Sequence, residues 1–98
     1  MHIERRRFER IELNREINYF IDSTKYTGTI KNLSAIGALL ISYNKIEASE
    51  IVLDFSFAPF AWARLTAKVT WSKGNKHGLD FDFNSIEQHQ ELKDWLYS

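Results

Sequence analysis

Hydrophobic and polar residues alternate with a period of two through most of the chain, which is the pattern of a β-strand with one face on a core. The clearest stretch covers residues 63–72, with apolar side chains at Ala63, Leu65, Ala67, Val69 and Trp71. Residues 51–58 and 78–83 alternate in the same way. Residues 73–76, Lys-Gly-Asn-Lys, read as the hairpin turn before the last of these stretches. The second half of the chain therefore predicts three strands.

The first half carries shorter signals of the same kind. Residues 17–21 alternate, and residues 22–25 are polar and typical of a turn. Residues 26–31 are rich in threonine and β-branched side chains, and residues 38–42 are a compact apolar run. About six strands at this spacing predict a small all-β barrel or sandwich.

The end of the chain changes to a helical period, with apolar or aromatic residues at Ile86, His89, Leu92, Trp95 and Leu96. Asn84, followed three residues later by Glu87, has the form of a capping box. We expect a single domain made of a flexible, Arg-rich arm over residues 1–13, a barrel over residues 14–83 and a helix over residues 84–98. The helix is expected to cover an open end or face of the barrel.

Composition narrows the class of protein. A chain that is 44% hydrophobic and 14% aromatic is not a disordered segment. The absence of cysteine excludes disulfides and thiolate zinc sites. No apolar run approaches the roughly 18 residues of a membrane span, and no signal-peptide core follows the first arginines. We therefore expect a cytoplasmic protein without membrane insertion. The net charge of +0 argues against a nucleic-acid polymer as partner.

The arginines are unevenly placed, because five of the six lie in the first fifteen residues. Arg6 and Arg10 are separated by three residues, in a segment without apolar periodicity. The flat, forked guanidinium group grips phosphates and purine edges with two hydrogen bonds. A solvated arm without a ligand is the commoner explanation of such a charge run.

A second motif occupies residues 32–37, Asn-Leu-Ser-Ala-Ile-Gly. Asn32 and Ser34 alternate around Leu33, so both polar side chains can leave the same face of an extended segment. Gly37 permits a positive φ or the close approach of a ligand. The alternative is an ordinary polar turn, in which Asn and Ser bind local backbone.

Together the two motifs resemble the PilZ domain, the bacterial receptor for the second messenger cyclic di-GMP. That family has an Arg, three residues and an Arg near the N-terminus. About twenty residues later it has an Asp or Asn, any residue, a Ser, two residues and a Gly. Arg6 and Arg10 fit the first element, and Asn32, Ser34 and Gly37 fit the second.

The resemblance covers nearly the whole chain. Residues 69–71, Val-Thr-Trp, and residues 77–81, His-Gly-Leu-Asp-Phe, look like the closing hairpin of the family and bring in Gly78. Glu9 departs from the pattern, because many members carry Pro before the second arginine. This departure removes no ligand-contacting group.

The resemblance implies an all-β fold with one C-terminal helix, in which a six-stranded antiparallel split barrel is capped by that helix. It also implies that cyclic di-GMP binds outside the barrel, between the arm and the Asn-x-Ser turn. Arg6 and Arg10 would contact guanine edges and phosphates, and Asn32 and Ser34 would hydrogen-bond a guanine edge or a phosphate. Gly37 would shape the turn.

Two further residues complete the ligand set that the resemblance implies. Gly78 comes from the closing hairpin. Arg5, directly before the first motif arginine, looks associated in this family with two stacked ligand molecules in place of one. No cofactor, metal or catalytic residue is implied, and the ligand is cyclic di-GMP alone.

The expected function is a cyclic di-GMP-binding regulatory module whose arm changes conformation on binding and which signals to a downstream partner protein. One alternative is a PilZ-like adaptor that works by protein contact without the nucleotide. Another is a small barrel that binds single-stranded nucleic acid. An enzyme has the least support, since Ser34 has no evident His and Asp partners and the chain has no phosphate-binding glycine loop. The three histidines, His2, His77 and His89, have no metal-ligand spacing.

Overall fold

A computed structural model of the chain describes residues 8–60 and 62–97. Two residues of the expected ligand set, Arg5 and Arg6, lie outside this range. Within the described residues the chain forms six strands and one helix. They are β1 (Ile11–Ile21), β2 (Thr24–Leu33), β3 (Gly37–Ile41), β4 (Glu50–Asp54), β5 (Arg64–Lys73), β6 (Lys76–Asp82) and α1 (Ile86–Tyr97).

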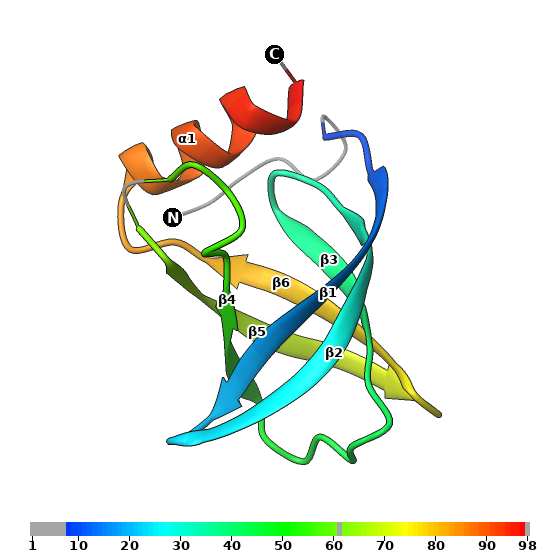
Figure 1. Cartoon of the computed structure of the whole chain (residues 1–98). Coiled ribbons are helices and arrows are strands. Elements are labelled where there is room, and N and C mark those ends of the chain that lie inside the picture. The colour runs from blue at the N-terminus through cyan, green and yellow to red at the C-terminus, as the bar shows by residue number, and fades with distance from the viewer. Residues whose placement is uncertain (1–7, 61, 98) are drawn as a thin grey trace.

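The strands pair antiparallel in the order β1-β2-β3-β6-β5-β4 and close into a barrel. Figure 1 shows α1 lying across one end of this barrel, while the loop between β3 and β4 lies at the other end. The predicted six-stranded antiparallel barrel with a C-terminal helix is therefore confirmed. The barrel begins at Ile11 and not at residue 14, because residues 11–13 belong to β1.

Inward-facing aliphatic side chains fill the barrel, and aromatic side chains close it. Leu33, Leu40, Leu53 and Leu65 are each 0% exposed. Leu92 of α1 is also fully buried, so the helix closes its end of the barrel. Around Phe55, aromatic rings pack against one another at this end: Phe57, Phe60, Trp62 and Phe81.

The predicted hairpin between the last two strands is confirmed. Lys73 pairs with Lys76, and Gly74 between them has φ of 62°. This left-handed conformation is costly for most residues and nearly free for glycine, which explains the glycine at the turn.

A β-bulge changes which way β2 points its side chains. Ile30 pairs with Leu40, but Asn32 pairs with Leu39, so Lys31 is an extra residue in the strand. Without the bulge, Asn32 would share the inward face of Ile30, because residues two apart share a face. With the bulge, Leu33 enters the core and Asn32 points outward.

A second bulge has the same effect on β5. Val69 pairs with Leu79 and Trp71 pairs with Gly78, which leaves Thr70 as the extra residue. We predicted from the alternation that Trp71 continues the core face of this strand, and this was wrong. The bulge turns the indole to the outside, where Trp71 is 50% exposed.

The cap of α1 lies one residue later than the sequence predicted. The Oγ atom of Ser85 accepts a hydrogen bond from the backbone N–H of Gln88 at 3.1 Å, which makes Ser85 the N-cap residue. The Gln88 side chain reaches back over the same turn and accepts the backbone N–H of Asn84, the residue before the N-cap, at 2.8 Å. Asn84 therefore contributes its backbone and not its side chain.

We expect Ser85→Ala to lower the free energy of unfolding by about 1 kcal/mol, because the substitution leaves an N–H of the first helical turn without its acceptor. Asn84→Ala is the matched control and should change stability by less than half as much. Urea denaturation followed by circular dichroism measures both. Equal losses in the two variants would contradict the cap at Ser85.

Candidate functional site

Arg10 of the arginine motif and Asn32 of the Asn-x-Ser motif meet at the end of the barrel near α1. The guanidinium Nη1 of Arg10 donates a hydrogen bond to Oδ1 of Asn32 at 2.8 Å. Arg10 directly precedes β1, and the pairing of Glu12 with Asn32 brings that end of β1 beside the end of β2. The bulge at Lys31 then places the Asn32 amide on the outer face. The structure thus joins two of the residues predicted to bind a ligand.

The Ser34 side chain is buried within the turn that follows Asn32. Its side chain is 1% exposed, and its Oγ accepts the backbone N–H groups of Ile36 and Gly37, each at 3.2 Å. The backbone N–H of Ser34 in turn donates to the carbonyl of Gly37 at 2.8 Å. Ser34 therefore does not share an exposed face with Asn32. It rigidifies the turn that follows Asn32.

Gly37 is required by close packing of the backbone. Its φ is not positive, and a Cβ atom at this position would overlap the carbonyl oxygen of Leu79 on the neighbouring strand. Gly37 pairs with Asp80, so the turn joins β6 without room for any side chain. Of the two reasons suggested by the sequence, close approach is correct, but the approaching group is another strand.

Trp71 adds an aromatic face to the outer surface that sequence reasoning missed. Asn32 pairs with Leu39, Leu39 with Gly78, and Gly78 with Trp71, so these residues form one row across four strands. The indole of Trp71 lies over Gly78, where a Cβ atom would overlap it. Gly78 therefore leaves the space in which the indole packs, and the indole is the group that is exposed to solvent.

A tyrosine in α1 joins the two segments of the site. The hydroxyl of Tyr97 donates to the carbonyl of Glu9 at 2.6 Å and accepts the N–H of Ala35 at 3.2 Å. No pattern in the sequence points to this residue, because 88 positions separate it from Glu9 and no motif includes it.

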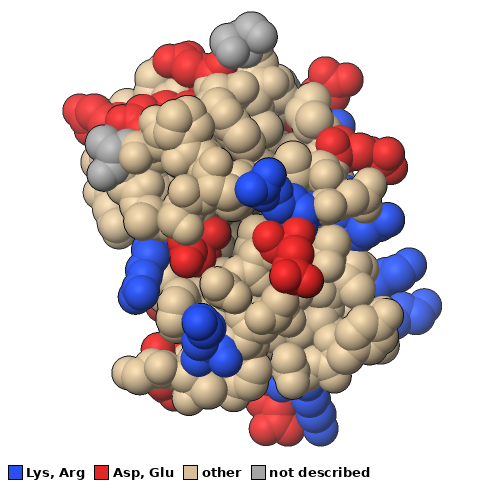
Figure 2. Space-filling view, in the orientation of Figure 1, with Lys and Arg blue, Asp and Glu red and all other residues tan. Residues whose placement is uncertain are grey.

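On the surface that Figure 2 presents, several acidic side chains lie at the helix end, while most of the basic ones lie over the barrel, interspersed with further acidic ones. Arg10 is an exposed cation. An anionic ligand at the Arg10–Asn32 pair would depend on this cation and on any other arginines that reach it.

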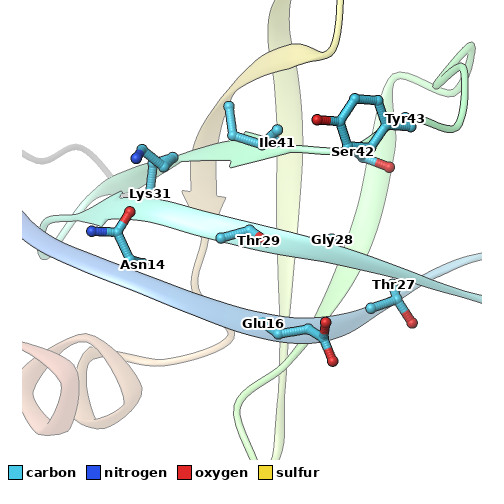
Figure 3. Close-up of a pocket in the computed structure, with 9 residues that line it drawn as sticks. All are labelled: Asn14, Glu16, Thr27, Gly28, Thr29, Lys31, Ile41, Ser42 and Tyr43. Carbon is cyan, nitrogen blue, oxygen red and sulfur yellow. The ribbon is translucent and has the colours of Figure 1, made fainter.

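A separate groove of about 410 Å³ lies on the outer face of β1, β2 and β3 (Figure 3). Glu16 and Lys31 line it together with threonines, Asn14 and Tyr43. One acid and one base provide no net positive charge for a phosphate group. Neither Arg10 nor Asn32 lines this groove, so we place the candidate site at the pair and not here.

Other kinds of site find little support in the described part of the chain. No three His, Cys, Asp or Glu side chains gather there in a way that could hold a metal ion. No helix there has both the length and the apolar character needed to cross a bilayer.

His89 lies beside the site, and among the described residues it is the one whose pKa is clearly shifted by the fold. Its ring packs edge-on against Phe8 and Phe83, with centroids 5.7 and 4.9 Å away. Burial, and to a lesser degree the charge of Lys93, lowers the pKa of His89 below its usual value. The folded protein therefore favours the neutral imidazole.

Comparisons with known proteins agree with the fold. The family model of the PilZ domain matches residues 4–98. No curated protein matches the chain significantly. Among solved structures, the crystal structure of an uncharacterized Legionella protein superposes with a TM-score of 0.60 at 20% identity, over 90% of this chain and 89% of that one. At this identity the match shows the fold alone.

We expect Gly37→Ala to destabilise the domain by about 2 kcal/mol or more, because the added methyl group meets rigid backbone. Gly74→Asn is the control, since nothing lies within 4 Å there and Asn tolerates a positive φ. Urea denaturation of both variants gives the comparison. A Gly37→Ala variant as stable as the control would contradict the strand contact.

Acid should destabilise the fold through His89. The folded-state pKa lies below the unfolded value of about 6.5, so the unfolded chain binds the proton more tightly. The stabilising contribution is complete above the unfolded pKa and is lost as the pH falls toward the folded one. We expect His89→Phe to show a smaller fall in Tm between pH 7.5 and pH 5.5 than the wild type. Parallel curves would exclude this role.

Proposed function

This chain belongs to the PilZ domain family, and from that premise we propose that it is itself a bacterial, cytoplasmic receptor for cyclic di-GMP. Members of the family are in general receptors for this nucleotide and are binding and regulatory domains, not catalytic ones. The observation that carries the proposal is the 2.8 Å contact between Arg10 and Asn32, which unites the two ligand motifs.

The chemistry of the pair suits the ligand. A guanidinium group has five N–H donors, and the contact with Asn32 uses one of them. The remaining donors match the N7 and O6 acceptors of a guanine edge and the oxygens of a phosphate. Asn32 holds the guanidinium through its oxygen and presents its amide N–H groups to the same ligand.

The row formed by Asn32, Leu39, Gly78 and Trp71 offers an apolar surface on which the bases of the ligand can pack. Leu39 is half-buried beside Asn32, and the exposed indole of Trp71 lies beyond it over Gly78. Neighbouring strands lie about 4.8 Å apart, so the row extends over roughly the size of a nucleotide. A guanine that stacks on the indole would bury apolar surface and gain about 1–3 kcal/mol.

The rest of the expected ligand set then divides into two roles. Ser34, Gly37 and Gly78 shape the site without facing the ligand. Arg5 and Arg6, by family resemblance, would supply further guanidinium groups, and Arg5 would allow a second stacked ligand molecule. In this proposal the arm orders over the bound nucleotide, and the changed surface is read by a downstream partner protein.

Arg10→Ala tests the proposal by isothermal titration calorimetry with cyclic di-GMP. We expect at least about tenfold weaker binding with an unchanged Tm, because charged hydrogen bonds are lost from an exposed position. Lys45→Ala is the charge-matched control: its side chain is 85% exposed, in the loop at the far end of the barrel (Figure 1). The control should bind like the wild type.

The same titration separates the alternatives. A wild type that binds GTP or a short oligonucleotide as well as cyclic di-GMP would contradict a dedicated receptor, and binding to none would favour the adaptor. The stoichiometry decides the hypothesis on Arg5, since one ligand per chain would reject the stacked pair.

A further inference from the structure

The C-terminal helix contacts both halves of the candidate site through one atom. The Oη of Tyr97 donates to the Glu9 carbonyl at 2.6 Å and accepts the Ala35 N–H at 3.2 Å. Glu9 directly precedes Arg10, and Ala35 directly follows Ser34 in the turn. A single hydroxyl therefore fixes the backbone on each side of the Arg10–Asn32 contact.

We call the two hydrogen bonds of the Tyr97 hydroxyl, to Glu9 and to Ala35, the junction. The ring of Tyr97 adds further contacts to it. Phe8 stacks on it with centroids 6.4 Å apart and planes inclined by 17°, and Phe8 also meets the edge of His89. Two aromatic residues of α1 thus hold the segment that leads into Arg10. The local sequence alone does not orient Arg10, because this residue lies before β1 and outside the backbone hydrogen bonds that pair the strands.

We propose that Tyr97 is a positioning residue of the ligand site, which holds the backbone before Arg10 against the Asn-x-Ser turn. Its hydroxyl has no predicted contact with the ligand and acts through Arg10 and the turn. The inference deepens the proposed function and rests on it for the identity of the ligand. The junction itself is a property of the protein without ligand.

The junction also makes α1 responsive to the site. If the Tyr97 hydroxyl stabilises the arrangement that binds ligand, then bound ligand must stabilise the contact of Tyr97 by the same factor, because coupling between two equilibria is reciprocal. Ligand binding would then tighten the last turn of α1 on the barrel. The stability of the helix end would then depend on whether the site is occupied.

Tyr97→Phe is the test, because it removes the hydroxyl and retains the ring that stacks on Phe8. Tyr43→Phe is the matched control: it removes the same group from a side chain that is 89% exposed on the loop after β3. Amide hydrogen exchange by NMR on both unliganded variants reports the backbone junction. Calorimetry with cyclic di-GMP reports its effect on binding.

We expect faster exchange of the Ala35 amide in Tyr97→Phe, and binding weaker by about three- to tenfold, the loss of one or two hydrogen bonds. Tyr43→Phe should match the wild type in both measurements. Affinity equal to the wild type in Tyr97→Phe, or unchanged exchange at Ala35, would overturn the positioning role.

The two proposals fail separately. A wild type that does not bind cyclic di-GMP would refute the proposed function, and the exchange of Ala35 would then decide the junction alone. In the double variant Tyr43→Phe, Tyr97→Phe, exchange and affinity equal to those of Tyr97→Phe alone would support the role of this hydroxyl in particular, and values equal to those of the wild type would overturn it.

Discussion

The direction in which a strand points its side chains is the constraint on which this molecule depends. In a closed barrel the inward face of each strand must be mostly apolar, so the face that the apolar residues occupy changes where a bulge inserts a residue. The bulges at Lys31 and Thr70 make that change in β2 and β5. They place an amide and an indole on the outer face, while the same two strands still deliver Leu33 and Leu65 to the core.

The candidate site combines a rigid half with a half held from outside. The turn after Asn32 is fixed by the Ser34 hydroxyl and by the tight approach of Gly37 to β6. Glu9, directly before Arg10, is held from outside by Tyr97 of α1. An arrangement of this kind suits a receptor, because one half provides a fixed surface and the other can respond to a ligand.

The helix accordingly serves two purposes. Leu92 closes one end of the barrel, and Tyr97 reaches from the last turn to the backbone on both sides of the Arg10–Asn32 contact. Closure explains why a helix is present, but not why its last turn carries a hydroxyl at this place. The second purpose links the stability of the helix end to the geometry of the site.

The sequence by itself determined the strands, the Gly74 turn, the closing helix and the two motifs, because each is written in alternation or in local spacing. It also predicted that the arginine motif and the Asn-x-Ser motif belong together, and Arg10 does meet Asn32. Only the tertiary structure decided that Ser34 faces inward, that Trp71 faces outward and that Tyr97 joins Glu9 to Ala35. A bulge is a single extra residue without a signature of its own, and a contact across 88 positions has no period to reveal it. Both follow from how the barrel closes, which no local pattern contains.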